Sequence, residues 1–512
     1  MSKEFQEPSD FFGKHVVVMG LGLHGGGQAV AQWLYAKGAR VCVTDLRSEE
    51  DLQPSVRTLQ NFCKEYSLCH QKENVFPIEW IFGEHRSEDM ARADLIIQNP
   101  GVPYDSPYLS LARSAGVAIE NEVTLFLSLT RKTPKIGVTG TRGKSTTTAL
   151  IHAMLRPSRP HALCVGIAGA GIKNFFSVLD TVLEHEALGI FDPVVMELSS
   201  YQLELFSPST QPLHIAVVTN ILSDHLNRHK TFEQYARIKE NIVRFQSDID
   251  GYAIFNYDNS ETRAMGKRHQ SGARLWFSRL HTFDGPGTFL LPDASGDPLR
   301  RMLSIQKEHG SYESICRVEE CALAGEHALE NILAASAAAQ CAGVPTQDII
   351  ASVKTFTGLP SRQEEISVFH GRTWINDTAA TSPDATRAAL GVFHAKGEKP
   401  HIILVAGGAD KNLDFTGLAS DSVRAVKSIV FLSGTATPRL ADAVLRAGFF
   451  GTCIYTNSMH EAVWRAWEAS ESGDVILLSP GCASFGMFVH EFDRGEQFVS
   501  EVHALRRSLG VS

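Results

Sequence analysis

The sequence predicts an α/β protein of three domains whose sheets are mostly parallel. At 512 residues the chain is too long for one ordinary hydrophobic core, and usual domain sizes suggest about three. Short β-branched runs that end in Gly, Asp, Asn or a similar turn residue recur along it. Each is followed by a helix-like segment, which is the pattern of βαβ units. These runs are residues 15–20, 135–140, 194–198, 215–220, 402–407, 429–434 and 475–479.

Composition excludes several classes of protein. Hydrophobic residues make up 43% of the chain and charged residues 21%, as in a folded globular protein. The first ten residues are polar and acidic, unlike a secretory signal, and no later run approaches a membrane span. The net charge of −9 argues against a general nucleic-acid binder. Nine cysteines without a Cys-x-x-Cys pair suit reduced thiols. We therefore expect a cytoplasmic protein that binds neither nucleic acid nor membrane.

Two polar links suggest where the domains meet. Residues 129–134 contain a proline and precede the strand of the second glycine-rich turn, and residues 358–361 read Gly-Leu-Pro-Ser. We expect domains at residues 1–131, 132–357 and 358–512. The polar segments 48–74 and 266–310 resemble insertions that carry hairpins or loops, and the alanine-rich stretch 334–342 is expected to be helical.

A glycine-rich turn after residues 135–138 predicts a phosphate-binding loop. The turn reads Thr-Gly-Thr-Arg-Gly-Lys-Ser-Thr-Thr from residue 139 to 147, and an apolar helix follows. Glycines let backbone N–H groups face phosphate oxygens, Lys144 adds charge and Ser145 can reach Mg²⁺. The strict pattern has a glycine where this chain has Val138, so the loop is a variant. The alternative is a glycine-rich turn that only starts a helix.

A second glycine pattern near the N-terminus predicts a Rossmann-like nucleotide site. Residues 20–25 read Gly-Leu-Gly-Leu-His-Gly after a strand, and Asp45 ends the next strand 20 residues after Gly25. Asp45 or Arg47 could contact a ribose, base or phosphate. Any tight strand-to-helix turn favours glycines, so this motif alone does not identify the ligand.

Polar residues also end two strands downstream of the phosphate loop. Glu197 lies at the carboxyl end of one strand and is a candidate Mg²⁺ ligand, while His225 follows the next strand and could bind metal or orient substrate. A strand-end salt bridge for Glu197 and an ordinary loop histidine are the alternatives.

With these motifs in order, the chain resembles the Mur ligases, most closely the members that add glutamate, over nearly its whole length. The matching residues are Gly20 to Leu23, Asn99 to Val102, the phosphate loop, Glu197 to Glu204, Asp224-His225, Lys239, Gly325 to His327, Asn331, Leu359 to Arg362, Trp374 to Asp377, Gly407 to Lys411, Ser479 to Ser484, Phe492 and Arg494-Gly495.

The resemblance implies a division of labour among the three domains. An N-terminal Rossmann-like domain binds a UDP sugar, a central P-loop ATPase domain binds ATP, and a C-terminal Rossmann-like domain binds the amino acid and closes over ATP. The implied reaction is ATP-dependent addition of glutamate, with D-glutamate expected, to UDP-N-acetylmuramoyl-L-alanine through an acyl phosphate. This is a cytoplasmic step of peptidoglycan precursor synthesis, and we expect a monomer whose partners are these substrates.

The resemblance also implies the residues of each site. Those for ATP are Gly140, Thr141, Gly143, Lys144, Ser145, Thr146, Asn331, Arg362 and Asp377. Those for the UDP sugar are Gly22, Leu23, His24, Asp45, Arg47, Asn99 and Gly101, and those for glutamate are Thr381, Lys411, Ser484 and Phe492. Lys144, Glu197, His225 and Lys239 are the implied catalytic residues. Two Mg²⁺ ions are implied, with Ser145, Glu197, His225 and carbamylated Lys239 as ligands.

The chain departs from the family pattern at two places. The family usually has a lysine where this chain has Ala379, and its Gly-Asn-Ile-Gly motif is replaced by Gly-Ile-Ala-Gly at residues 166–169. Alternatives therefore remain open: an L-glutamate-adding variant, another Mur ligase, or an amide ligase resembling folylpolyglutamate synthetase. A nicotinamide-dependent dehydrogenase would leave the phosphate loop unexplained, and a regulatory ATPase would leave the C-terminal motifs unexplained.

Overall fold

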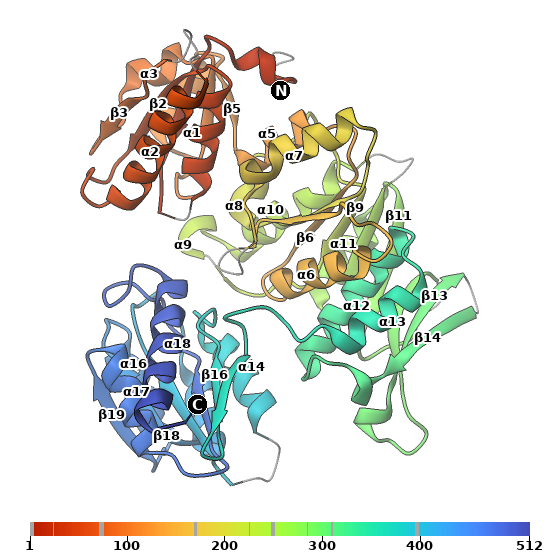
Figure 1. Ribbon diagram of the computed structural model, residues 1–512. Coiled ribbons are helices and arrows are strands. Elements are labelled where there is room, and N and C mark those ends of the chain that lie inside the picture. The colour runs from red at the N-terminus through yellow and green to blue at the C-terminus, as the bar shows by residue number, and fades with distance from the viewer. Residues whose placement is uncertain are drawn as a thin grey trace. The chain divides into compact units, whose positions relative to one another are not determined.

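The structure, a computed structural model, confirms the α/β class. It describes residues 5–23, 25–70, 76–167, 172–224, 226–246, 251–283, 285–308, 311–394 and 399–511 (Figure 1). Two compact units divide the chain, one of Met1–Ala322 with Ala328–Phe356 and one of Leu323–His327 with Thr357–Ser512. The first unit holds two sheets and the second holds one. The domain boundaries at 131 and 357 stay predictions. No helix in the described ranges is long and apolar enough to span a membrane.

The first sheet is parallel throughout, in the order β3-β2-β1-β4-β5. Its inner strands are nearly continuous apolar runs because both faces are covered. The strand order reverses between β1 and β4, which is where parallel sheets bind ligands. The elements are η1 Pro8–Phe11, β1 His15–Met19, α1 Gly26–Ala36, β2 Arg40–Asp45, α2 Gln53–His70, β3 Glu79–Phe82, α3 Ser87–Arg92, β4 Leu95–Gln98, α4 Pro107–Ser114, β5 Ala118–Glu120 and α5 Glu122–Leu129.

The prediction of hairpins or loops at residues 48–74 is wrong. Helix α2 (Gln53–His70) occupies most of this segment, and residues 71–74 lie outside the described ranges. Leu52, Val56 and Leu59 are fully or almost fully buried, so they form one narrow apolar stripe at helical spacing. The residues between them are mostly polar, so the overall composition of the segment does not reveal this stripe. Pro54 is tolerated because it lies in the first turn.

The second sheet has nine strands in the order β14-β13-β12-β11-β10-β9-β6-β8-β7. The strands from β7 to β12 pair in parallel, whereas β12, β13 and β14 are antiparallel, which confirms hairpins in the predicted insertion at 266–310. The strands are β6 Lys135–Thr139, β7 Leu163–Val165, β8 Val194–Glu197, β9 Ile215–Val218, β10 Tyr252–Asn256, β11 Ala273–Ser278, β12 Gly287–Leu291, β13 Met302–Glu308 and β14 Ser311–Arg317.

Helices cover this sheet, and α12 confirms the predicted alanine-rich helix (Figure 1). Its alanines are buried, since small side chains allow close packing. The helices are α6 Lys144–Leu155, α7 Phe175–Ala187, α8 Ser200–Leu203, α9 Leu226–His229, α10 Phe232–Arg244, α11 Ser260–Arg268, η2 Pro298–Arg300, η3 Val318–Glu320, α12 Glu326–Cys341 and α13 Thr346–Thr355.

The third sheet, in the second unit, has the order β15-β16-β20-β17-β18-β19 and is parallel except for β15. All strand runs predicted from the sequence therefore appear as parallel strands. The elements are β15 Glu364–Phe369, β16 Arg372–Asn376, α14 Pro383–Phe393, β17 Ile402–Ala406, α15 Thr416–Ala425, β18 Val426–Leu432, α16 Thr437–Arg446, β19 Thr452–Thr456, α17 Met459–Glu468, β20 Val475–Leu478 and α18 Glu491–Ser508.

A buried lysine fixes the link that enters β6. The side chain of Lys135 is 1% exposed, and its Nζ donates to the carbonyl oxygens of Thr130 and Thr133. Glu186 accepts hydrogen bonds from the backbone N–H groups of Lys132 (3.0 Å) and Thr133 (2.8 Å). Burial lowers the pKa of Lys135 to about 7, and the carboxylate of Glu186 opposes this shift.

Lys135 should make the stability of the first unit depend on pH. Its pKa is about 7 when folded and near 10.5 when unfolded, so between these values the unfolded chain holds one more proton. The free energy of unfolding should therefore rise with pH in this window, by up to about 1.4 kcal/mol per pH unit. Lys135→Met should remove that rise, as measured by urea unfolding at pH 7, 8 and 9. Equal slopes for the two proteins would contradict the assignment.

Candidate active site

Two glycines shape the phosphate loop between β6 and α6. Gly140 has φ +151°, and a Cβ there would lie 1.9 Å from Thr219 Oγ1. Gly143 precedes α6 with φ +79°, and a Cβ there would lie 2.1 Å from Asn331 Oδ1. Both positions therefore require glycine for its conformation and for its lack of a side chain.

The loop is held by the segment that follows β9. Thr141 and Arg142 donate their backbone N–H groups to the backbone and side-chain oxygens of Asn220, at 2.8 and 2.9 Å. Thr219 Oγ1 donates to the carbonyl of Arg142 at 2.6 Å. The N–H groups in the first turn of α6 have no partner within the helix, so they can face an anion. This arrangement suits the phosphates of a nucleotide.

Lys144, Ser145 and Thr146 form the first turn of α6, as the motif predicts. The Lys144 ammonium donates to the carbonyl of Thr141 at 3.1 Å, which folds it back over the loop. Asn331 reaches the same turn from α12, where its Oδ1 accepts a hydrogen bond from Thr147 Oγ1 at 3.4 Å. The structure thus brings the predicted ATP residues of the first unit together.

Glu197 ends β8 beside the loop strand, since it pairs with Val138 of β6. Its Oε2 is buried and has no hydrogen-bond partner among the described residues. An unpaired buried carboxylate oxygen is costly unless a cation or donor joins it. Oxygen ligands are those that Mg²⁺ prefers, so Glu197 with the Ser145 hydroxyl suits this ion. The described residues hold no group of three or more His, Cys, Asp and Glu side chains that could bind metal by themselves.

Lys239 reaches the loop from α10. Its Nζ donates to the carbonyl of Gly140 at 2.7 Å and lies 3.4 Å from Thr139 Oγ1. The side chain is buried, and this burial lowers its pKa well below the usual value. The charge of Lys144 acts in the same direction, against the carboxylates of Asp224 and Glu197. The structure thus places Lys239 beside the phosphate loop, and its functional role stays a prediction. His225 lies outside the described residues.

Tyr235 was not predicted from the sequence. Its hydroxyl lies 3.1 Å from Thr141 Oγ1, and its ring centroid lies 5.0 Å from the Lys239 ammonium nitrogen. Tyr235 and Lys239 are four residues apart on α10, so they share one helix face. That spacing is a signal that could have identified Tyr235.

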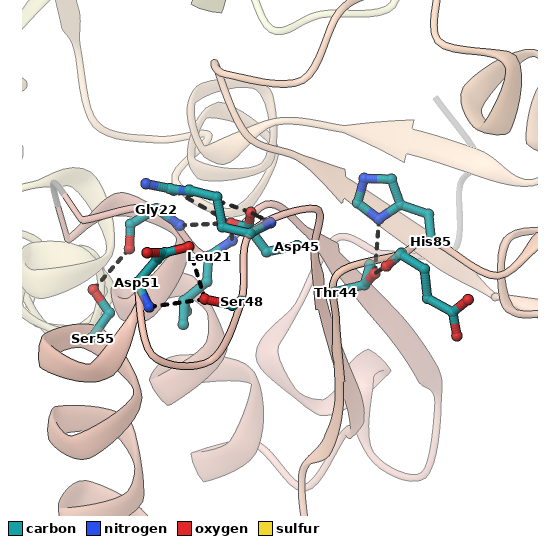
Figure 2. Close-up of polar contacts among 10 residues, drawn as sticks. Leu21, Gly22, Thr44, Asp45, Ser48, Asp51, Ser55 and His85 are labelled. Atoms are coloured by element: carbon teal, nitrogen blue, oxygen red, sulfur yellow. Dashed lines mark hydrogen bonds and ion pairs between the residues drawn. The ribbon is translucent and has the colours of Figure 1, made fainter.

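A carboxylate organises the glycine turn of the first sheet. Figure 2 shows Asp45 beside this turn, where its Oδ2 accepts the N–H groups of Leu21 (3.0 Å) and Gly22 (3.3 Å). Its Oδ1 accepts from the Arg47 backbone N–H at 3.0 Å, and Ser55 Oγ donates to the carbonyl of Gly22 at 2.7 Å. The predicted residues Gly22, Asp45 and Arg47 are therefore brought together. Leu23 follows in the same turn, and His24 lies outside the described residues.

Asn99 packs under the same turn from the end of β4. A Cβ at Gly27 would lie 2.2 Å from Asn99 Nδ2 and a Cβ at Gly20 would lie 3.3 Å from Asn99 Cβ. The buried Oδ1 of Asn99 has no partner among the described residues. Gly101 follows in the exposed part of the loop after β4. Asn99 thus offers a free acceptor at the switch point of the first sheet.

A buried ion pair, also not predicted, connects this loop to the second sheet. Arg228 donates to both oxygens of Glu204, at 3.0 and 2.7 Å, and to the carbonyl of Val102 at 2.8 Å. His229 Nε2 lies 2.9 Å from Ser200 Oγ on α8. Arg228 therefore ties the loop after β4 to the helix that follows Glu197.

In the second unit, Asp377 lies buried at the end of β16. It accepts hydrogen bonds from the Gln363 N–H (3.1 Å) and from Ser479 Oγ (2.8 Å). Burial raises its pKa to about 7, and the hydrogen bonds together with the charges of Arg362 and Arg494 oppose this shift. Arg362 and Asp377 are thus electrostatic neighbours, as predicted for one binding site.

Three of the predicted glutamate residues, Thr381, Lys411 and Ser484, lie on loops that follow the carboxyl ends of the neighbouring strands β16, β17 and β20. Lys411 Nζ approaches Thr381 Oγ1 at 3.5 Å. Ser484 Oγ is buried without a partner in the described ranges, and Phe492 is buried near the start of α18. Ala379 keeps its loop in place through its backbone N–H, which donates to the carbonyl of Ser361 at 3.1 Å.

Three family models match the chain. They are the Mur ligase MurD-like N-terminal domain at residues 14–121, the Mur ligase middle domain at 138–339 and the Mur ligase glutamate ligase domain at 361–482. A relative from Roseiflexus sp. named UDP-N-acetylmuramoylalanine–D-glutamate ligase is 40% identical, over 95% of this chain and 97% of the relative. One of the same name from Symbiobacterium thermophilum is 35% identical, over 96% and 98%.

Solved structures share the fold. The UDP-N-acetylmuramate-alanine ligase of Thermotoga maritima superposes with a TM-score of 0.60 at 19% identity, covering 96% of this chain and all of that one. A pseudomurein peptide ligase type C from Methanothermus fervidus gives 0.52 at 18% identity, with the same coverage.

Gly143→Ala should weaken nucleotide binding because its methyl group would collide with Asn331. We expect the Kd for a non-hydrolysable ATP analogue to rise about tenfold or more, about 1.4 kcal/mol, in isothermal titration. Gly189→Ala is the matched control, since Gly189 has φ +75° with open space around it. That control should cost about 1 kcal/mol of stability and leave binding unchanged. Equal binding by both variants would refute the role of the close contact.

Proposed function

Because the chain belongs to the Mur ligase family, we propose that it joins D-glutamate to UDP-N-acetylmuramoyl-L-alanine at the expense of ATP, through an acyl phosphate. The observation that carries this proposal is the 40% identity, along nearly the whole of both chains, to a relative named for that reaction. The phosphate loop with Glu197 and Lys239 beside it supports the ATP half. The L-glutamate-adding ligase is the alternative outcome of the test below.

The proposed sites follow the three sheets. Gly22, Leu23, His24, Asp45, Arg47, Asn99 and Gly101 bind the UDP sugar in the first domain, residues 1–131. Gly140, Thr141, Gly143 to Thr146 and Asn331 bind ATP in the second, residues 132–357. Arg362 and Asp377 contact ATP from the third, residues 358–512, where Thr381, Lys411, Ser484 and Phe492 bind glutamate. The free acceptor of Asn99 and the unpaired hydroxyl of Ser484 support two of these assignments.

Phosphoryl transfer to a carboxylate requires neutralised charge and aligned oxygens. The N–H groups at the start of α6 hold the phosphates, and Lys144 lies close enough to pair with their charge. The glutamate amine then attacks the acyl phosphate. In this proposal Lys411 and the hydroxyls of Thr381 and Ser484 orient the glutamate carboxylates, because a cation and O–H donors are what carboxylates accept.

Mg²⁺ is the proposed cofactor, in two positions. Ser145 and Glu197 hold one ion, and His225 with carbamylated Lys239 holds the other. The unpaired Oε2 of Glu197 supports the first position. When bound, the metal ions neutralise charge on the phosphate oxygens.

Carbamylation of Lys239 is supported by its surroundings. The buried amine has a lowered pKa, so more of it is unprotonated and nucleophilic. Attack of such an amine on CO₂ with loss of a proton gives a carbamate, which replaces the amine by an anionic oxygen ligand. We also propose a monomer acting in the cytoplasm, where nucleotide-linked sugars and ATP are available.

The purified protein should release phosphate from ATP only when the UDP-linked acceptor and D-glutamate are both present with Mg²⁺. Replacing D-glutamate by L-glutamate should abolish turnover, because the proposed pocket orients both carboxylates and the amine. A coupled phosphate assay and mass spectrometry of the nucleotide product measure this. Turnover with L-glutamate alone would establish the alternative ligase, and no glutamate-dependent turnover with either isomer would refute the proposal.

Lys239→Ala should lower kcat about 100-fold or more, as expected when a metal site loses a supporting group. Acetate or formate should restore part of the activity, because a small carboxylate can replace the carbamate in the space left by the side chain. Lys267→Ala, at an exposed position on α11, is the control and should keep full activity. Full activity of Lys239→Ala in plain buffer would remove the proposed role.

A further inference from the structure

Two cysteines lie in contact where the chain first leaves the first unit. Cys316 is near the end of β14 and Cys321 follows the short helix η3. Their Sγ atoms are 3.9 Å apart, which is van der Waals contact, and five positions separate them in sequence. Neither belongs to the sites described above. Two thiols whose sulfur atoms are already in contact are close to the separation that a disulfide requires.

The two thiols differ in access. Cys316 is 4% exposed, whereas Cys321 is partly exposed and lies 3.6 Å from the carbonyl of Arg317. Lys354, on α13, pairs with Glu320 at 2.6 Å and so places a cation beside the turn. The more accessible sulfur therefore lies beside this ion pair, within reach of the charges of both Lys354 and Glu320.

Electrostatics favour a thiolate at Cys321. The hydrogen bond with the Cys316 thiol lowers the pKa of Cys321, and Lys354 acts in the same direction, whereas burial and the carboxylate of Glu320 oppose this shift. The pKa of Cys316 is raised, first by this same hydrogen bond and then by burial. Such a pair has the properties of an attacking and a resolving cysteine.

We propose that Cys316 and Cys321 form a reversible modification site, a dithiol that low-molecular-weight disulfides such as glutathione disulfide convert to an intrachain disulfide. The Cys321 thiolate attacks the reagent, forms a mixed disulfide and releases one glutathione thiolate. Cys316 then loses its proton, attacks Cys321 Sγ and releases the second glutathione. The protein loses two protons and two electrons, and the reagent gains them as two thiols.

The disulfide would restrain the segment where the chain passes from the first unit to the second. Cys321 precedes Ala322, the last residue of the first unit before the chain crosses to Leu323. Ala322 donates its N–H to the carbonyl of Val353 at 3.1 Å, and α13 leads to the later crossing after Phe356. A disulfide would therefore fasten this segment to β14 in the oxidised protein.

The test uses the full chain carrying Cys69→Ser, which removes an exposed thiol that would take up glutathione by itself. Reduced protein is incubated with glutathione disulfide at pH 7.5 and examined by intact mass and peptide mapping. We expect a loss of about two mass units without bound glutathione, a peptide pair joined through Cys316 and Cys321, and full reversal by dithiothreitol.

Single variants separate the steps. Cys316→Ser should accumulate a stable glutathione adduct on Cys321, since no resolving thiol remains, and Cys321→Ser should form neither the adduct nor the disulfide. Cys341→Ser is the control and should behave as the parent, because Cys341 is a partly buried thiol on α12 whose pKa is raised to about 12 by burial. A disulfide that joins other cysteines, or no mass loss in the parent, would overturn the proposal.

Discussion

The phosphate loop can close only without side chains at Gly140 and Gly143, and the geometry of the first unit follows from this. With no Cβ in the way, Gly140 packs against Thr219 and Gly143 against Asn331, so β9 and α12 approach the loop from two sides. Gly140 also offers its carbonyl to Lys239. The functional groups are therefore spaced by close contacts of side chains with the backbone of the loop. One added methyl group would move several of them together.

The loop after β4 is coupled to this site by Arg228. The guanidinium joins the carbonyl of Val102 to Glu204, which follows directly on α8, and this helix begins three residues after Glu197. A buried ion pair contributes little net stability, because desolvation offsets the attraction, but it fixes position strongly. The N-terminal sheet and the second sheet share one hydrophobic core as well. The proposed substrate site of the first sheet and the phosphate loop are therefore joined within one packed unit.

Sequence reasoning recovered the parts of this arrangement that local patterns encode. Strand runs and glycine spacing predicted the strands that precede the phosphate loop, Glu197 and Asp45, and the order of strand, loop and helix at Lys144. They did not predict β4 and β16, the strands that precede Asn99 and Asp377. It failed at α2, because the three buried apolar residues that give this helix its apolar stripe are separated by polar residues in the sequence. It also missed the ion pair between Arg228 and Glu204, because residues 24 positions apart in sequence come into contact only in the folded chain. Tyr235 could have been identified from the sequence, because it lies four residues before Lys239 and helical spacing places both side chains on one face.

The second unit shows how a departure from the family pattern can leave a site intact. Buried Arg494 donates to the hydroxyl (3.0 Å) and the carbonyl (2.8 Å) of Thr378, so the loop after β16 keeps its path although Ala379 replaces a lysine. The cation of the proposed glutamate pocket is then Lys411, next to Thr381. Among the described atoms, the buried hydroxyl of Ser484 has no partner, which costs free energy. In the proposed glutamate pocket a carboxylate that accepts this hydrogen bond would recover that cost, so the proposal assigns part of the missing lysine's role to hydroxyl donors.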